Sequence, residues 1–349
     1  MNRLRNVSLI ALLVSGCSSE PEALTPEYAS PGSTAASATP PDASSDASQD
    51  VIAPTPDAGV ADADPTLLHD GGSKFPHPLT GTADPTLVTT GLVFAEGPLW
   101  LPSTGQLLFS DITADKTYLL VPGGTPTVHH DPSNHANGHA LAPSGIVYTC
   151  EQGAGAGRLT RTLANGAVEV VVSMFGGLPL NSANDVIVRS DGNVYFTDPN
   201  FTGNSQPKQN VFRLAPMTAA PTVVDDTLQK PNGIALSPSE DTLYVASYAG
   251  DFINKYPIAA DGSTGAGSRF VSGLTKPDGI TTDDAGNVYA AVASGIAVYR
   301  RDGTLLGTIT IPNGKRASNM SFGDADRRTL YITAQTDIYK VKLNVAGRP

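Results

Sequence analysis

Residues 184–198 have the sequence NDVIVRSDGNVYFTD, and this stretch shows how the chain folds. An apolar run rich in Val and Ile is followed by a Ser-Asp-Gly turn and then by a second run with aromatic and β-branched residues. Two such runs around an Asp-Gly turn are the pattern of a β-hairpin. The stretch therefore predicts two antiparallel strands, with Asn184 at the start of the first.

The same unit occurs six times in the chain. Each copy opens with an acidic or amide side chain, and the six opening residues are Glu96, Asn137, Asn184, Asn232, Asp278 and Asn319. Successive copies begin 41, 47, 48, 46 and 41 residues apart. No helical period of useful length separates them, so the repeat predicts an all-β protein.

Each hairpin is followed by two further apolar runs, which gives four strands per repeat, as in a propeller blade. The sixth copy ends after its third run, at Leu343, and an outer-strand-like run, PTLVTTGL at residues 85–92, precedes the first copy. We therefore expect a six-bladed β-propeller whose last blade is closed by an N-terminal strand. Such closure leaves no open sheet edge, so we expect a monomer. A solenoid is the rival architecture, but the chain offers no capping segments for it.

Residues 1–17 predict an export signal of the lipoprotein type. Arg3 and Arg5 precede an apolar segment that is too short to span a bilayer. The segment ends in Val-Ser-Gly-Cys, which resembles a bacterial lipoprotein box with Cys17 as the lipidated residue. We expect a lipid anchor in the bacterial cell envelope, at the outer membrane facing the periplasm. Ordinary secretion with cleavage nearby is the alternative.

Residues 18–72 form an acidic tether in this interpretation. They are rich in Ala, Ser, Pro, Thr and Asp, and they contain ten acidic residues but no Lys or Arg. Such a composition cannot bury enough apolar surface to offset the entropy of ordering. The remaining propeller domain, residues 73–349, has a formal charge of −3 and no long basic run. This excludes an electrostatic surface for nucleic acid and leaves the anchor as the only expected membrane contact.

The six opening residues predict a cation site. Innermost strands surround the axis of a propeller, so their first residues should surround one mouth of the central channel. Two carboxylates and four amides would meet there without a Lys or Arg among them. Oxygen donors without Cys or His favour a hard ion such as calcium, with magnesium as a more demanding alternative. For any single Asn-Gly pair, a simple turn is the competing interpretation.

The last residue of each second strand should lie beside this ring. In the first three repeats these residues are acidic: Asp111, Glu151 and Asp198. They could orient ligands or water, or they could accept backbone hydrogen bonds at the strand ends. Four histidines between His129 and His139 suggest zinc only weakly, because the segment has no cysteine and no helical spacing. His135, which we expect near the mouth and the substrate, is the better candidate for a general base.

Four segments also carry a resemblance to a known family: AEGPLW (95–100), LNSANDVIVRSDGNVYFTDPNF (180–201), KPNGIALSPSEDTLYVAS (230–247) and KPDGITTDDAGNVYAA (276–291). They are similar to the gluconolactonase group of six-bladed propellers, relatives of senescence marker protein (regucalcin), over about residues 85–343. The resemblance implies a divalent ion, usually calcium, held by Glu96, Asn232 and Asp278, with Asn184 at the ion or the substrate. Ser182 stands where the regucalcin branch has an Arg, so the bacterial gluconolactonase branch is the better match.

Residues and resemblance together predict calcium-dependent hydrolysis of a lactone, with a sugar lactone as the expected substrate. Asn137 and Asn184 would donate hydrogen bonds to substrate oxygens, and either Asp278 or Asp198 would take the proton of the attacking water. The chain has no G-x-S-x-G motif for a serine hydrolase. A propeller that only binds a small ligand or a partner protein is the non-enzymatic alternative.

Overall fold

The structure is a computed structural model that describes residues 67–70 and 73–348. Within these residues nearly all regular structure is β-strand, and the one helical element is a 3₁₀ turn at Pro312–Gly314. None of the described segments forms a helix long and apolar enough to span a membrane. The expected signal peptide with Cys17, and most of the expected tether, lie outside the described residues.

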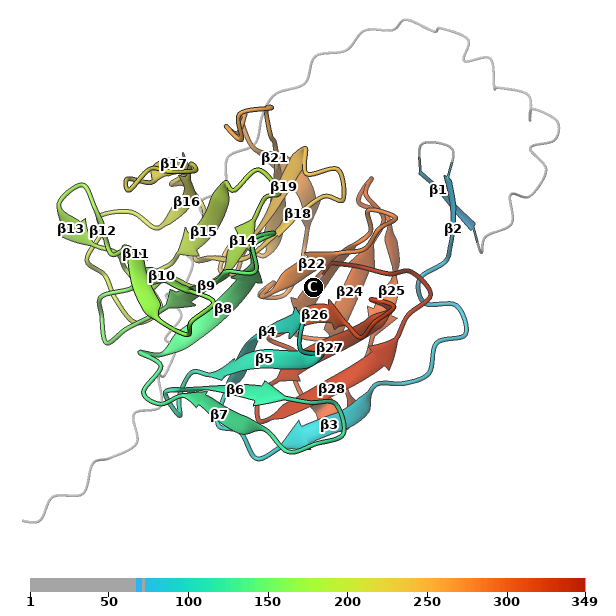
Figure 1. Cartoon of the computed structure of the whole chain (residues 1–349). Coiled ribbons are helices and arrows are strands. Elements are labelled where there is room, and N and C mark those ends of the chain that lie inside the picture. Colours follow the sequence, from blue (N-terminus) through green and yellow to red (C-terminus); the bar gives the residue numbers. More distant parts are fainter. Residues whose placement is uncertain (1–66, 71–72, 349) are drawn as a thin grey trace, which may run out of the picture. The chain divides into compact units, whose positions relative to one another are not determined.

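Six four-stranded antiparallel sheets follow one another along the chain (Figure 1). The first three blades consist of β4 (Ala95–Leu101), β5 (Gln106–Asp111), β6 (Lys116–Leu120) and β7 (Thr127–His130); β8 (Ala136–Leu141), β9 (Val147–Glu151), β10 (Arg158–Thr162) and β11 (Val168–Val172); and β14 (Val186–Val188), β15 (Val194–Asp198), β16 (Asn210–Leu214) and β17 (Thr222–Asp225).

The last three blades have the same internal order of strands. They consist of β18 (Pro231–Leu236), β19 (Thr242–Ser247), β20 (Phe252–Pro257) and β21 (Ser268–Ser272); β22 (Ile280–Thr282), β23 (Val288–Val292), β24 (Gly295–Tyr299) and β25 (Leu305–Ile309); and β26 (Asn319–Gly323), β27 (Thr329–Ala334), β28 (Asp337–Lys342) and β3 (Thr86–Thr90). The four-strand repeat predicted from the sequence is thereby confirmed.

The innermost strands close into a circle. Strand β4 contacts β8, and contacts continue through β14, β18 and β22 to β26, which in turn contacts β4. Strand β3 is the outer strand of the last blade, because Ile338 of β28 pairs with Thr89 and Asp337 pairs with Thr90. The chain is therefore a six-bladed β-propeller closed by its N-terminal strand, as predicted.

Two short hairpins lie outside the blades. Strands β1 (Leu67–Asp70) and β2 (Ser73–Pro76) pair with each other, so strand pairing begins ahead of the boundary expected after Gly72. Strands β12 (Met174–Phe175) and β13 (Leu178–Pro179) form a second hairpin between the second and third blades. The repeat pattern did not predict either hairpin, because neither belongs to the repeating unit.

The hydrophobic core lies between neighbouring blades. In one cluster, Tyr289 of the fifth blade meets Phe322 of the sixth blade edge to face, with ring centroids 5.3 Å apart. In another, Cys150 of the second blade packs with Phe196 and Phe212 of the third. Burying each sheet face against the next blade holds the inner strands at fixed positions around the axis.

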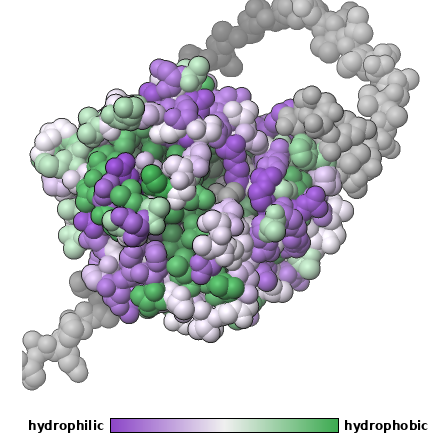
Figure 2. Space-filling model, in the orientation of Figure 1, coloured by the Kyte–Doolittle hydropathy of each residue, from purple (hydrophilic) through white to green (hydrophobic). Residues whose placement is uncertain are grey.

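The outer strands expose apolar side chains. Val128 of β7 and Val168 and Val170 of β11 each have about half of their surface exposed, at 53%, 46% and 53%. Figure 2 shows hydrophobic side chains on the outside of the first and second blades among hydrophilic neighbours. Single exposed apolar residues of this kind are normal at a protein surface.

Deleting residues 85–92 should destabilise the propeller, because the edge of β28 loses its partner strand β3. We expect Tm to fall by about 5 °C or more, since a domain of this size loses about 2–4 °C per kcal/mol. Thermal unfolding of the full chain and of the deletion variant measures this. Deleting residues 67–70, which pair only with β2 among the described strands, is the matched control. Equal Tm values for wild type and the 85–92 deletion would contradict the closure.

Candidate metal and substrate site

Five of the six opening residues line one cavity of about 450 Å³. They are Glu96, Asn137, Asn184, Asn232 and Asp278, and each has less than a tenth of its surface exposed. We refer to these five as the ring residues. Asn319 is not among the residues that line the cavity. It lies beside a smaller hollow of about 40 Å³ on the channel, together with Asp185 and His139.

Strand register explains why Asn319 differs. In the first, second and fourth blades the pairing of the two inner strands is shifted at the ring residue, for example between Glu96 and Leu99. Such β-bulges re-aim side chains next to functional sites. In the third and fifth blades the ring residue precedes the inner strand. Asn319 instead pairs regularly with Thr333, so its side chain follows the ordinary alternation of a strand.

Glycine after the ring residue lets neighbouring blades approach closely. A Cβ atom on Gly97 would lie 1.9 Å from the carbonyl oxygen of Asn137, and one on Gly233 would lie 2.3 Å from that of Asp278. The backbone N–H of Gly233 donates to the same Asp278 oxygen at 3.1 Å. The Asn-Gly and Asp-Gly pairs are therefore packing contacts between blades at this end of the strands, and the hairpin turns lie elsewhere.

The acidic residues at the ends of the second strands hold the loops that lead into the ring. The carboxylate of Asp111 accepts the N–H groups of Val93 and Phe94 at 2.8 and 2.9 Å, just before Glu96. Asp198 accepts the N–H groups of Asn181 and Ser182, both at 2.9 Å, just before Asn184. In the fourth blade Ser247 has the same role, since its hydroxyl donates to the carbonyl oxygen of Gln229 at 2.9 Å.

Asp198 is consequently separated from the cavity. Its side chain is fully buried, both carboxylate oxygens bind backbone N–H groups, and it does not line the cavity. Burial raises the pKa of Asp198 to about 7. Of the two roles expected from the sequence, the geometry favours that of a backbone acceptor. Glu151 is likewise engaged, by Arg158 at 2.5 Å and by Asn134 at 2.8 Å.

The four histidines between His129 and His139 are not among the residues that line the cavity. His135 does not line it, and its Nδ1 lies 2.9 Å from the carbonyl oxygen of Ile112, a residue of the cavity wall. His139 is buried between blades, with Nε2 2.8 Å from the Ser110 hydroxyl and Nδ1 2.9 Å from that of Thr149. Among the described residues no group of three or more His, Cys, Asp or Glu side chains is arranged as a metal site.

Three buried carboxylates give the centre a negative charge. Burial, and after it the charge of Asp278, raises the pKa of Glu96 well above its ordinary value. Burial raises the pKa of Asp278 to about 7, although Arg316 opposes this shift. The third carboxylate is Asp185, beneath the ring, and burial raises its pKa to about 7 as well. The amide of Asn319 donates to Oδ2 of Asp185 at 3.5 Å, and the side chains of Asn232 and Asn319 oppose the rise in the pKa of Asp278 and Glu96, respectively.

Arg316, Phe201 and Tyr248 are residues of the cavity wall that the sequence repeat did not predict. Arg316 forms an ion pair with Asp278, with 3.3 Å between Nη2 and Oδ2. Phe201 and Tyr248 stand edge to face, with ring centroids 5.4 Å apart, and both line the cavity. All three lie in loops outside the repeated hairpin. The signal that could have found Arg316 is a basic residue shortly before the opening residue, which also occurs at Lys230 and Lys276.

The donor set of the ring suits a hard divalent cation. Two carboxylates and three amide side chains offer oxygen ligands within one cavity, and a single cation, Arg316, stands among its lining residues. Calcium takes six to eight oxygen ligands from carboxylates, amides and water in flexible geometry. Neutralising the crowded carboxylates would also remove the cost of holding like charges together away from water. The residues present therefore fit such an ion.

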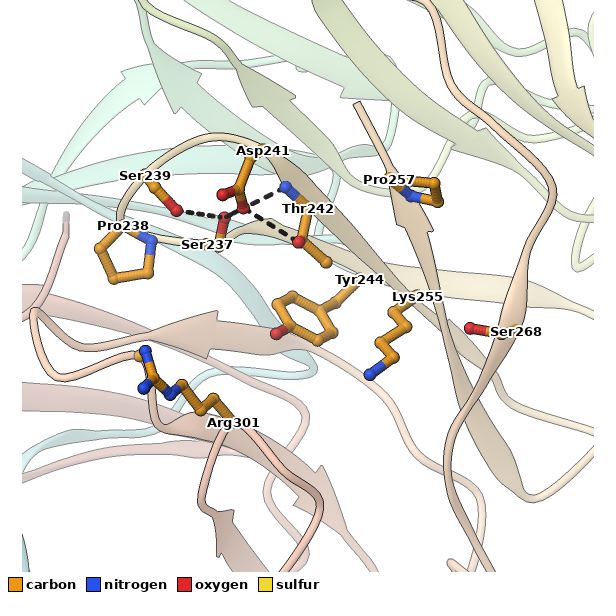
Figure 3. A pocket seen from close by; sticks show the side chains of 11 residues that line it. Ser237, Pro238, Ser239, Asp241, Thr242, Tyr244, Lys255, Pro257, Ser268 and Arg301 are labelled. Atoms are coloured by element: carbon orange, nitrogen blue, oxygen red, sulfur yellow. Dashed lines mark hydrogen bonds between the residues drawn. The ribbon is translucent and has the colours of Figure 1, made fainter. Parts of the chain in front are cut away.

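A larger hollow of about 770 Å³ lies elsewhere, at the turn that joins the far end of β18 to β19 (Figure 3). Asp241 is the one carboxylate among its lining residues, and it accepts hydrogen bonds from the hydroxyls of Ser237 and Thr242 at 2.9 and 3.0 Å. No second acid converges there. The smaller cavity at the ring, which brings two buried carboxylates together with amides, is the better candidate for chemistry.

Comparison with known proteins agrees with the fold and identifies the family. The family described as SMP-30/Gluconolactonase/LRE-like region matches residues 94–336. The chain belongs to this family, as the resemblance implied. A gluconolactonase from Zymomonas mobilis is 30% identical over 297 residues, which cover 75% of this chain and 82% of the relative. A pentonolactonase from Haloferax volcanii is 29% identical over 265 residues, which cover 71% and 83%.

Solved structures of two relatives superpose on the propeller. A gluconolactonase from Xanthomonas campestris matches with a TM-score of 0.70 and 30% identity, over 76% of this chain and 91% of the other. A calcium-binding regucalcin from Agrobacterium tumefaciens matches with a TM-score of 0.66 and 19% identity, over 76% and 96%. The second similarity is one of fold.

Replacing His139 by Gln should make the protein less sensitive to acid. Burial lowers the pKa of His139 to about 3, whereas an unfolded histidine titrates near about 6.5. The neutral His139 imidazole therefore makes its full contribution to stability at pH values above the pKa of the unfolded state. This contribution is lost as the pH falls from that pKa toward the pKa of His139 in the folded state. The loss is on the order of 2 kcal/mol between about pH 7 and pH 4.5.

Thermal unfolding over this pH range measures the effect, with His130→Gln as the control at a more exposed histidine. Wild type and His130→Gln should lose more Tm on acidification than His139→Gln. The same loss of Tm in all three proteins would contradict the role of His139.

Proposed function

We propose that this protein is a metal-dependent lactonase. Its metal ion, for which calcium is the first candidate, is held by Glu96, Asn184, Asn232 and Asp278. The observation that carries the proposal is the convergence of two buried carboxylates and the amide side chains on one cavity. A protein that only bound a partner through its surface would gain nothing from this arrangement, because burying carboxylates without compensation is costly.

The ion would polarise the lactone carbonyl and stabilise the negative charge that develops on its oxygen. The amide groups of Asn137 and Asn184 would make a second contribution to catalysis. Both line the cavity and can donate hydrogen bonds to substrate oxygens. Phe201 and Tyr248 cover one side of the cavity and limit the access of water to the reacting carbonyl.

Hydrolysis needs a base for the attacking water. Of the two acids considered from the sequence, Asp278 alone lines the cavity. Water attacks the carbonyl carbon while its proton passes to the Asp278 carboxylate. The ester bond of the ring then breaks, and the proton is returned to the departing ring oxygen. The products are one hydroxy acid and no covalent enzyme intermediate.

The relatives support the substrate class. Proteins that share about 30% identity over most of their length with this chain are a gluconolactonase and a pentonolactonase. We therefore propose a sugar lactone as the substrate. The first measurement is hydrolysis of a panel of sugar and aliphatic lactones, with and without chelator, and the panel includes D-glucono-1,5-lactone.

Replacing Glu96 by Gln or Asp278 by Asn keeps the shape of each side chain and removes its charge. Since interactions with a charged partner contribute about 1.5–3 kcal/mol, calcium affinity should fall by roughly tenfold or more. Lactone hydrolysis at limiting calcium should fall with it. Titration calorimetry and a lactonase assay on the same samples measure both effects.

Thr113→Val is the matched control, because Thr113 lines the same cavity but is exposed and carries no charge. It should bind calcium as the wild type does. Full hydrolysis by both charge variants in the presence of chelator would reject the metal-dependent reaction.

We also propose that Cys17 anchors the protein to the bacterial outer membrane on its periplasmic side. The proposal is supported by the Val-Ser-Gly-Cys sequence at residues 14–17 and by the acidic tether that follows it. A Cys17→Ala variant should be released into the soluble fraction. Cell fractionation tests this, and an unchanged membrane fraction would count against the anchor.

A further inference from the structure

Three cationic side chains stand on the rim of the cavity at successive blades. Lys230 precedes Asn232 by two residues, and Lys276 precedes Asp278 by two residues. Arg316 precedes Asn319 by three residues. All three belong to loops that enter the innermost strands β18, β22 and β26, so they lie at the same end of the blades as the ring residues.

Aromatic rings of the cavity wall hold these cations. The Lys230 ammonium lies 4.7 Å from the centroid of Phe201. The Lys276 ammonium and the Arg316 guanidinium lie 5.9 and 5.2 Å from that of Tyr248. Phe201 and Tyr248 line the cavity, so the positive charge is attached to its wall. We refer to these three cations and two rings as the cationic rim.

The backbone fixes both lysines in place. Each has a φ of 51°, in the left-handed region that ordinarily favours Gly or Asn. The N–H of Lys230 donates to Oε1 of Gln209 at 3.1 Å, and the N–H of Lys276 donates to Oδ1 of Asp251 at 2.9 Å. The two lysines therefore enter their strands in the same backbone conformation, at equivalent positions of adjacent blades.

Two of the three charges on the rim, those of Lys230 and Lys276, are not cancelled by an ion pair with a described residue. Within residues 67–70 and 73–348, no carboxylate lies within ion-pair distance of Lys230 or Lys276. Arg316 pairs with Asp278, yet its buried Nε has no hydrogen-bond partner. Asp251 is the acid on this rim, and it binds the backbone of Lys276 rather than its ammonium.

Apart from the ring residue Glu96, the residues that the first and second blades contribute to the cavity wall carry no charge. They are Phe94, Ile112, Thr113 and Gln152. A substrate whose lactone carbonyl lies at the ring therefore has a positive wall on the side of the fourth to sixth blades and a neutral wall on the other. Such one-sided charge orients a ligand and raises the local concentration of anions.

We propose that the substrate is a lactone with a second, anionic group, a carboxylate or a phosphate ester, which the cationic rim receives while the lactone carbonyl lies at the ring. This inference rests on the lactonase activity proposed above. The rings of Phe201 and Tyr248 would pack against the carbon skeleton between the two groups. Lys230 and Lys276 would bind the anionic group, whereas the reacting carbonyl would be bound at the ring residues.

Steady-state hydrolysis of three lactones by the full chain tests the proposal. D-glucono-1,5-lactone is neutral, D-glucaro-1,4-lactone carries a carboxylate, and 6-phospho-D-glucono-1,5-lactone carries a phosphate. We expect a higher kcat/KM for at least one anionic lactone, and the better of the two identifies the anionic group. Raising the salt concentration from about 0.02 M to about 0.5 M should raise KM for that lactone only.

Lys230→Gln and Lys276→Gln should each raise KM for the anionic lactone about two- to fivefold, the range for an exposed charge pair. Both should leave hydrolysis of the neutral lactone unchanged. Lys255→Gln is the matched control, because the Lys255 ammonium also lies over an aromatic ring, 5.9 Å from Phe270, but at the distant hollow of Figure 3.

The outcomes separate the two proposals. Better hydrolysis of the neutral lactone, or an unchanged KM for the anionic lactones in both lysine variants, overturns the inference while the lactonase activity stands. If none of the three lactones is hydrolysed with calcium present, the proposed function itself is overturned.

Discussion

Two like charges are held together away from water at the centre of this propeller, and the arrangement of the site depends on them. Glu96 and Asp278 come from different blades, yet the charge of Asp278 raises the pKa of Glu96, and burial raises the pKa of both. An isolated pair of buried carboxylates is unfavourable. Their convergence therefore needs a rigid frame, and it creates a place where a divalent cation is strongly favoured.

Closure of the blades supplies that frame. Packing between neighbouring sheets holds the inner strands, and the glycines after the ring residues let adjacent backbones approach to hydrogen-bond distance. Asp111 and Asp198 then fix the loops that lead into Glu96 and Asn184. Acids at the ends of the second strands thus accept backbone hydrogen bonds, one of the two roles expected for them from the sequence.

The repeat in the sequence predicted the parts of the molecule that the repeat itself determines. Strand order, closure by β3 and the convergence of Glu96 and Asp278 follow from six equivalent hairpins. The exclusion of Asn319 does not, because Asn319 pairs regularly inside its strand, whereas the other opening residues lie at a shifted register or ahead of the strand. Arg316 and Tyr248 lie in loops whose paths no periodicity encodes.

The central claim is that a divalent cation at the ring is required for lactone hydrolysis. The most direct measurement is the rate of D-glucono-1,5-lactone hydrolysis by the wild-type full chain in buffers of fixed free calcium. The account predicts a negligible rate in chelator and a saturable rise with free calcium, with a midpoint that matches the calcium dependence of Tm. A hydrolysis rate that is the same at every free calcium concentration, chelator included, would contradict it.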